Sequence, residues 1–299
     1  MHNYVTAIGF MDMYDTPDMD KIIKDYIEMS VENNVVKYVK KEPGKSHYLT
    51  AEIDMPLLSD CDGNHCGGIK IRGKYNSDTG KFYYTNCFPY AVSNYSYYAE
   101  SISVTMKKDS EGYLGIVSGQ VSELSPIFSV INDIELTPEK SDFENVNVYL
   151  TGLALEGKII LPANLSNKPE QTDSDINRGR LLDRALSGDR DAITELTMVD
   201  LDTYIDIGKR IKNEDVYSIV YSSMVPAGLE SDMYSVVGNI LEIDTLENDV
   251  TGNYLYMLLI ECNAMVFHVI IDSSTLLGEP EVGRRFVGSV WLQGKISID

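Results

Sequence analysis

The sequence is poor in the residues and motifs that most often carry enzyme chemistry. Its 299 residues include four cysteines, four histidines and a single tryptophan. Four cysteines in a chain of this length do not form a disulfide framework, so we expect reduced thiols. The chain also lacks a Gly-x-Ser-x-Gly element, a His-Glu-x-x-His pair and a dinucleotide-binding glycine fingerprint. We therefore predict no particular catalytic residues and no cofactor.

Basic residues are scarce as well. Lys and Arg number 25 against 46 Asp and Glu, which gives a net charge of -21 at pH 7. A field of this sign repels phosphate backbones and anionic membrane surfaces. The local basic stretches are short and lie at 37–45, 107–108 and 284–285. The charge therefore disfavours nucleic acid and membranes as partners, and an unidentified protein or small ligand is expected; the oligomeric state stays open.

Long apolar runs are missing too. The longest apolar window, residues 254–260, has the length of a strand, whereas a membrane helix needs roughly 18 apolar residues. The first ten residues have neither a basic start nor a long apolar stretch, which is unlike a secretory signal peptide. We therefore expect a cytoplasmic protein.

Residues 1–165 predict an α+β domain with a mostly antiparallel sheet. Thr16-Pro17-Asp18 is typical of a helix start, with a capping hydroxyl ahead of a proline at the first helical position. Apolar residues then recur at helical spacing, which predicts one early helix over 18–32. Residues 1–10 are interpreted as a first strand. Turn clusters separate the later strand-like segments, which are 35–40, 48–55, 68–75, 81–88, 101–106, 127–134 and 146–161.

The composition changes at Pro162. Residues 162–174 are polar, contain two prolines and are typical of a linker. Apolar residues then return at helical spacing, so 166–222 is predicted to be a helical connector. In 223–299, several short strands are predicted, and glycines punctuate alternating apolar residues near the end. This pattern favours a third domain, a small β-barrel of the oligonucleotide/oligosaccharide-binding type or a related one.

Two loops share one sequence pattern. Asn-x-x-Thr-Gly-x-aromatic occurs at Asn76–Phe82 and again at Asn248–Tyr254. The pattern predicts a hairpin loop built around a type I turn, with glycine in the left-handed conformation before the returning strand. The sequences that flank the two loops share little, so we favour the reuse of one turn over a duplicated domain.

The densest set of potential metal ligands lies in a short stretch with several glycines. Asp60, Cys61, Asp62, His65 and Cys66 supply carboxylate, thiolate and imidazole groups. A zinc site on the two cysteines would need two further ligands, and a calcium loop would need glycine where His65 stands. We interpret the stretch as a polar turn between two strands, with a metal site as the alternative that we do not favour.

Aromatic residues are concentrated between Phe82 and Tyr98, where eight of 17 positions are Phe or Tyr. Exposed aromatic rings bind sugars, peptides or bases by stacking. Tyr and Phe are also preferred strand residues, so packing on a sheet explains most of them. The candidates for ligand binding are Tyr90, Tyr95, Tyr97 and Tyr98.

Three parts of the chain together resemble a known family. They are the opening Met1-His2 with Ala7-Ile-Gly-Phe10, the Ser187-Gly-Asp turn followed by Asp215-x-x-Ser218, and the ending Gly278-Glu-Pro-Glu-Val-Gly-x-Arg285-Phe-x-Gly288-x-x-Trp291-Leu-Gln-Gly294. They resemble domain of unknown function 3881, an uncharacterised family of anaerobic Gram-positive bacteria (Firmicutes), mainly gut Clostridia. The resemblance spans nearly the whole chain. It implies no activity, so it assigns no functional residue.

Three functions follow from these observations. The first is a non-enzymatic cytoplasmic module that binds a protein or a small ligand. The second is a hydrolytic enzyme that uses carboxylates or a metal near Asp60–Cys66. The third is binding of single-stranded nucleic acid by the C-terminal barrel, which the net charge disfavours. We favour the first.

Overall fold

A computed structural model describes residues 3–11, 13, 16–38, 47–106, 113–118, 125–136, 142–162, 221–263 and 265–297. The chain divides into two compact units, residues 1–160 with 222–299 and residues 161–221. The helical connector predicted for 166–222 lies almost wholly outside the described residues.

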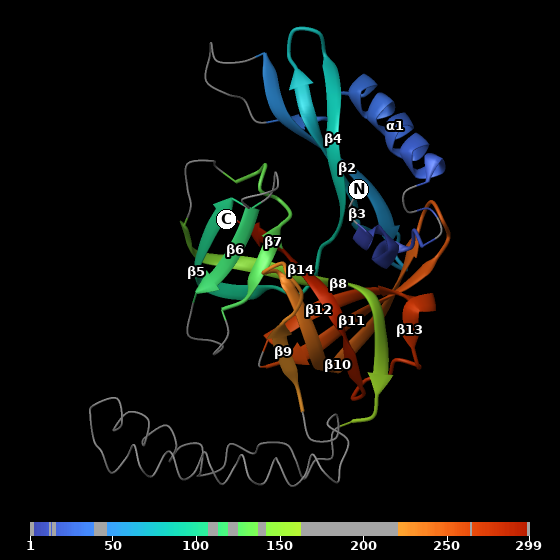
Figure 1. The fold of residues 1–299 in the computed structure, drawn as a ribbon, viewed down its shortest axis with the longest axis vertical. Helices are drawn as coiled ribbons and strands as arrows, with labels where there is room; N and C mark the ends of the chain where they lie inside the picture. Colours follow the sequence, from blue (N-terminus) through green and yellow to red (C-terminus); the bar gives the residue numbers. More distant parts are fainter. Residues whose placement is uncertain are drawn as a thin grey trace, which may run out of the picture. The chain divides into compact units, whose positions relative to one another are not determined.

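Most described residues lie in strands, and the strands form one 14-stranded sheet (Figure 1). The elements are η1 Asn3–Ile8, α1 Pro17–Glu32, β1 Lys37–Tyr38, β2 Tyr48–Ser59, β3 His65–Asn76, β4 Lys81–Ala91, β5 Tyr97–Met106, β6 Tyr113–Ser118, β7 Ile127–Val130, β8 Asp142–Ile160, β9 Ser223–Pro226, β10 Met233–Asn248, β11 Tyr254–Cys262, β12 Met265–Asp272, η3 Ser273–Thr275, β13 Leu276–Leu277 and β14 Arg285–Ser297.

The predicted fold class is wrong. An α+β protein with a mostly antiparallel N-terminal sheet domain, a helical connector and a separate small C-terminal barrel would keep its early and late strands in different sheets. In the structure, β8 pairs with β12, β13 and β14, and β2 pairs with β10. Paired strands satisfy each other's backbone hydrogen-bonding groups, so the two parts of the chain form one mostly β unit.

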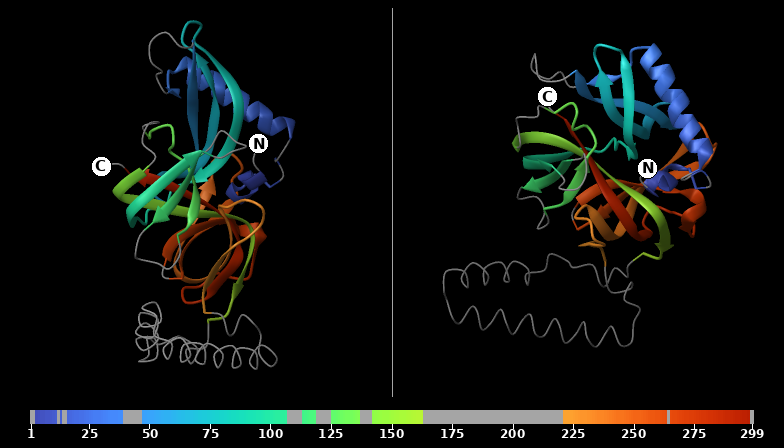
Figure 2. Two further views of the ribbon diagram at one scale, coloured as in Figure 1. Left: turned by 60° about the vertical axis from the view of Figure 1, so that its left-hand side comes forward. Right: turned by 45° about the horizontal axis from the view of Figure 1, so that its top comes forward.

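Two closed rings of strands share β8 and β14. One ring runs β8–β14–β10–β11–β12 and returns to β8, and it is seen nearly end-on in the left view of Figure 2. The other runs β8–β5–β6–β7–β14 and also returns to β8. The sequence predicted that the late strands alone close into a barrel of the oligonucleotide-binding type. This prediction is wrong, because β8 completes their ring.

Two buried clusters fill this unit. The first draws on the strands of both rings and includes Phe128, Phe143, Phe267 and Phe286. The second joins η1, α1 and the strands β2, β3 and β4 to the outward side chains of β8, β11 and β14, among them Trp291. Trp291 Nε1 donates a hydrogen bond of 2.8 Å to the buried Asp232 carboxylate. The tryptophan is thus a packing residue with a satisfied polar atom.

The N-terminal segment holds one correct and one wrong prediction. The helix expected over 18–32 is confirmed as α1, with Pro17 in the first turn and the Thr16 hydroxyl accepting a hydrogen bond from the Met19 amide. The strand expected over 1–10 is wrong, because 3–8 form the 3-10 helix η1. Val5 and Ile8 are fully buried there. A short apolar stretch does not by itself distinguish a strand from a buried helical turn.

The two hairpin loops with a shared pattern are confirmed. Asn76 Oδ1 accepts hydrogen bonds from the amides two and three residues later, and Asn248 Oδ1 does the same in its own loop. Gly80 and Gly252 have φ values of 66° and 71°, a region in which glycine has no steric penalty. One local solution therefore closes both the β3–β4 and the β10–β11 hairpins.

Candidate functional site

The sheet formed by β2, β3 and β4 has one apolar and one polar face. Ile53 and Ile71 are fully buried on the apolar face, in the second cluster. Successive residues of a strand point to opposite faces, so the charged neighbours of Ile53 and Ile71 in the two strands lie together on the other face. The register aligns this polar face in rows across β2, β3 and β4: Tyr48–Asn76–Lys81, Thr50–Lys74–Tyr83, Glu52–Arg72–Asn86, Asp54–Lys70–Phe88 and Pro56–Gly68–Tyr90.

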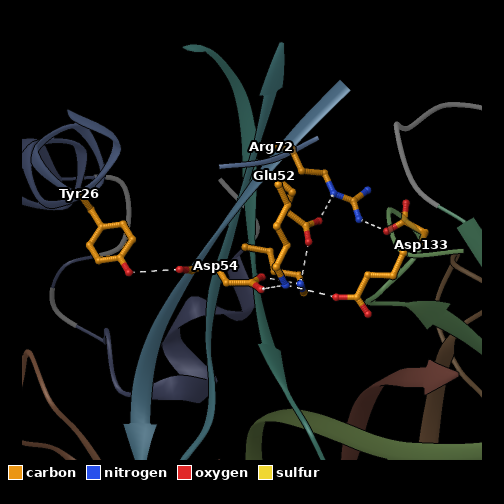
Figure 3. Close-up of polar contacts among 8 residues, drawn as sticks. Tyr26, Glu52, Asp54, Arg72 and Asp133 are labelled. Carbon is orange, nitrogen blue, oxygen red and sulfur yellow. Dashed lines mark hydrogen bonds and ion pairs between the residues drawn. The ribbon is translucent and has the colours of Figure 1, made fainter. Parts of the chain in front are cut away.

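The middle rows of the polar face hold buried ion pairs. Lys70 Nζ lies 2.7 Å from Glu52 Oε1 and 2.6 Å from Asp54 Oδ1. Arg72 Nε lies 3.1 Å from Glu52 Oε2, and its Nη2 atom pairs with Asp133, as Figure 3 shows. Glu52 is fully buried and bridges the two cations. Charges removed from water are tolerated only when they are paired in this way.

The ion pairs continue to the surface through Lys37. Its Nζ lies 2.7 Å from Asp54 Oδ2 and 3.2 Å from Glu135 Oε1. We call the whole set the ion-pair cluster, which consists of Lys37, Glu52, Asp54, Lys70, Arg72, Asp133 and Glu135. Asp133 and Glu135 follow β7 in the chain, whereas their cations belong to β1 and β3. The cluster therefore ties the segment after β7 to the polar face.

Aromatic rings of β4 lie against both buried cations. Lys70 Nζ is 4.9 Å from the ring centre of Tyr90, and Arg72 Cζ is 4.6 Å from that of Phe88. A cation over the face of an aromatic ring is attracted by the ring quadrupole. Carboxylates and rings thus surround the two cations together.

The charged groups of the cluster shift one another's pKa values. Burial alone would lower the pKa of Lys70, but Glu52 and Asp54 raise that pKa above its ordinary value. Burial alone would raise the pKa of Asp54, but Lys70 and Lys37 hold that pKa below its usual range. Burial raises the pKa of Asp133, and Arg72 offsets this only in part. Lys70 stays protonated, so it is no amine nucleophile.

Five residues in the two rows at one end of the same face are exposed to solvent. Tyr48 and Tyr83 are 44% and 45% exposed, and their rings contact edge to face with centres 5.7 Å apart. Lys74 and Lys81 are exposed beside them. We call this surface the tyrosine–lysine patch, which consists of Tyr48, Thr50, Lys74, Lys81 and Tyr83. Two aromatic rings and two cations thus lie together on one sheet face, a combination that can contact a ligand.

The lysines of the patch carry charge that the neighbouring acids do not neutralise. Within the part of the chain that the structure describes, neither Lys74 nor Lys81 has an ion-pair partner. Asp78, the acid of the adjoining hairpin loop, pairs with His47 at 2.5 Å. The patch is therefore locally positive on a chain of net charge -21.

The stretch with potential metal ligands forms the turn between β2 and β3. Asp60 Oδ1 accepts hydrogen bonds from the amides of Asp62 and Asn64, which is the geometry of an Asx-turn. His65 lies beside Ser59 and Asp249, and Cys66 donates to the Leu58 carbonyl. Among the described residues, no three His, Cys, Asp or Glu side chains are placed to hold a metal ion. The Asp60 carboxylate is engaged in shaping the turn.

The four tyrosines predicted as ligand-binding residues occupy different surroundings. Tyr90 lies on the polar face against Lys70. Tyr97 packs on the first buried cluster, and the exposed Tyr98 donates a hydrogen bond of 2.7 Å to Asn145. Tyr95 is 41% exposed in the loop before β5. Only Tyr90 adjoins the ion-pair cluster, and ligand binding by the four stays a prediction.

A buried histidine lies outside the polar face, on β12. His268 is 1% exposed, and its Nδ1 atom is 2.7 Å from the Ser93 hydroxyl. In the described part of the chain its Nε2 atom has no hydrogen-bond partner. Burial lowers the pKa of His268 to about 4, against an opposing effect of Asp244. The imidazole is therefore neutral in the folded protein at neutral pH.

This histidine should make the protein less stable in mild acid. The unfolded chain binds a proton at His268 below a pKa of about 6.5, whereas the folded chain does so only near its pKa of about 4. Stability is therefore lost as the pH falls through this window, by about 2 kcal/mol at pH 5. Urea unfolding at several pH values gives the free energy of unfolding as a function of pH. This free energy should fall less steeply between pH 7 and pH 5 for His268→Asn than for the wild type. Equal slopes would contradict the prediction.

The fold and the polar face define a mostly β protein with a charged network in its interior and a tyrosine–lysine patch at its surface. Residues 5–294 match the family described as "Domain of unknown function, E. rectale Gene description (DUF3881)". The chain belongs to this family, and the resemblance inferred from the sequence is confirmed. No curated protein and no solved structure matches the chain. Within the described residues, no helix has the length and apolar character to cross a membrane.

Proposed function

We propose that this protein is a non-enzymatic cytoplasmic module that binds a protein or a small ligand through the tyrosine–lysine patch. The observation that carries the proposal is the pair of exposed, mutually contacting rings of Tyr48 and Tyr83, flanked by two lysines that have no ion-pair partner among the described residues. Tyrosine supplies a large contact area at a low cost in conformational entropy, and it is enriched at binding surfaces.

The ion-pair cluster supports a binding role over a catalytic one. Its cations are held by carboxylates and rings, so no charged group of the cluster points unpaired toward a substrate. The cluster also connects β2 and β3, which carry part of the patch, to the segment after β7. A patch on a braced sheet loses little entropy when it binds, which favours affinity.

A thermal-shift and calorimetry screen with peptides, oligosaccharides and nucleotides tests this function. We expect at least one ligand whose affinity falls about tenfold in the Tyr48→Ser/Tyr83→Ser double variant, because a stacked aromatic ring contributes about 1–3 kcal/mol. Tyr254→Ser is the matched control, since it removes an exposed tyrosine outside the patch, and Tyr98→Ser tests the exposed tyrosine that was predicted from the sequence. Hits that depend on Tyr98 and not on the patch would overturn the proposal, and so would conversion of the ligand during incubation.

A further inference from the structure

The outer edge of β4 beside the patch is an unpaired strand edge. In the described part of the chain, β4 is the last strand of the sheet path and pairs only with β3. Near its end, the Gln293 side chain covers this edge, with Nε2 donating to the Pro89 carbonyl at 2.8 Å and Oε1 accepting from the Ala91 amide at 3.4 Å. No such cover is described along residues 81–85, where Lys81, Tyr83, Tyr84 and Thr85 are exposed.

An added strand would meet two different surfaces at this edge. On the polar face its side chains would lie beside Lys81 and Tyr83, with Lys74 next to Tyr83 on β3. On the other face they would lie beside Phe82, which packs on the second cluster, and Tyr84, which is 47% exposed. Because strand side chains alternate between faces, this edge fits a segment in which acidic and apolar residues alternate.

The charges favour a peptide over a nucleic acid. Single-stranded nucleic acid brings a negative charge with every nucleotide, and a protein of net charge -21 repels it beyond the two lysines of the patch. An acidic peptide can place two or three carboxylates at these lysines and carry no others. A peptide also presents N–H and C=O groups at the spacing of a strand edge, whereas the N–H and C=O groups of nucleobases do not repeat at that spacing.

We propose that the tyrosine–lysine patch and the adjoining edge of β4 bind an extended acidic segment of a partner protein as an additional strand. The proposal rests on the binding function given above and names its partner. Lys81 and Lys74 recognise the carboxylates, Tyr83 packs against the side chains between them with its ring supported by Tyr48, and the edge of residues 81–85 pairs with the peptide backbone.

Fluorescence anisotropy with a labelled hexapeptide of alternating glutamate and valine tests the proposal on the full chain. We expect saturable binding that weakens as salt increases. Lys74→Glu/Lys81→Glu should weaken it at least tenfold. Lys21→Glu/Lys24→Glu is the matched control, because it makes the same change of charge at two exposed lysines of α1. Equal losses in both variants would mean nonspecific attraction and would overturn the proposal.

Two further probes separate the modes of binding. The same hexapeptide with an N-methyl group on every amide has no N–H left to donate to a strand edge, so its binding should be lost; undiminished binding would overturn strand addition. A labelled oligothymidylate should bind more weakly than the hexapeptide, and tighter binding would identify nucleic acid as the ligand instead. If neither binds while another ligand from the screen depends on Tyr48 and Tyr83, the acidic peptide is refuted and the binding function stands.

Discussion

Replacing Arg72 by methionine should destabilise the protein by about 3–5 kcal/mol, because the change leaves the buried Asp133 carboxylate without its cation and Glu52 with one of its two. Arg72 pairs with Glu52 and Asp133, whose side chains are 0% and 9% exposed. Its guanidinium also lies over the ring of Phe88. Urea unfolding at pH 7, with the midpoint and the slope both fitted, measures the loss.

Two comparisons test whether the loss comes from the buried charge. Lys37→Met removes a cation of the same cluster that is 47% exposed, so it should cost less than about 1 kcal/mol. The double variant Arg72→Met/Asp133→Asn should recover part of the loss, since it also removes the carboxylate left unpaired. A cost at Arg72 no larger than that at Lys37, or no recovery in the double variant, would refute the explanation.

The destabilisation by Arg72→Met should also depend on pH in a defined direction. Arg72 lowers the pKa of Asp133, which burial raises. Without Arg72 the pKa of Asp133 in the folded state rises further above its unfolded value, and a group of this kind destabilises the fold at pH values above that pKa. The difference in the free energy of unfolding between the variant and the wild type should therefore become smaller as the pH falls through the raised pKa of Asp133.

Local structure could be predicted from the sequence where the cause is local. The capping hydroxyl of Thr16 with Pro17 fixes the start of α1, and the Asn76 and Asn248 loops follow one turn chemistry. The strand pairing could not be predicted, because β8 takes partners from both ends of the chain. No sequence pattern near Asp142–Ile160 indicates which strands pair with β8.

The candidate site was not predicted from the sequence, although part of it leaves a signal there. Glu52 and Asp54, and likewise Lys70 and Arg72, alternate within strands that were expected, so a charged face was visible in each strand. Their burial depends on the segment after β7, which reaches them through pairings distant in the sequence. Tyr83 belongs to the aromatic-rich stretch, but its partner Tyr48 lies on another strand, and the β2–β3–β4 register brings the two together.

Replacing Gly294 by alanine should cost about 3 kcal/mol, because a methyl group there meets a ring that cannot move freely. A Cβ atom at Gly294 would lie 2.4 Å from Cδ2 of Phe128, and one at Gly115 would lie 2.4 Å from Cζ of the same ring. Phe128 is fully buried between the two glycines. Overpacking of this kind forces shifts of side chain and backbone, here where β7 joins β14 and the second ring closes.

A double-mutant cycle shows whether the Phe128 ring is the cause. Gly294→Ala combined with Phe128→Leu should be more stable than the sum of the single changes predicts, by about 1 kcal/mol or more, because leucine frees the space that the methyl group needs. Gly63→Ala is the control: its Cβ would meet no atom within 4 Å, but its φ of 79° lies in the left-handed region. It should cost about 1 kcal/mol from backbone conformation alone. If the two changes in the free energy of unfolding were strictly additive, the Phe128 ring would not be the obstacle. The strand ring would then tolerate a side chain at position 294, and any loss of stability in Gly294→Ala would have another origin.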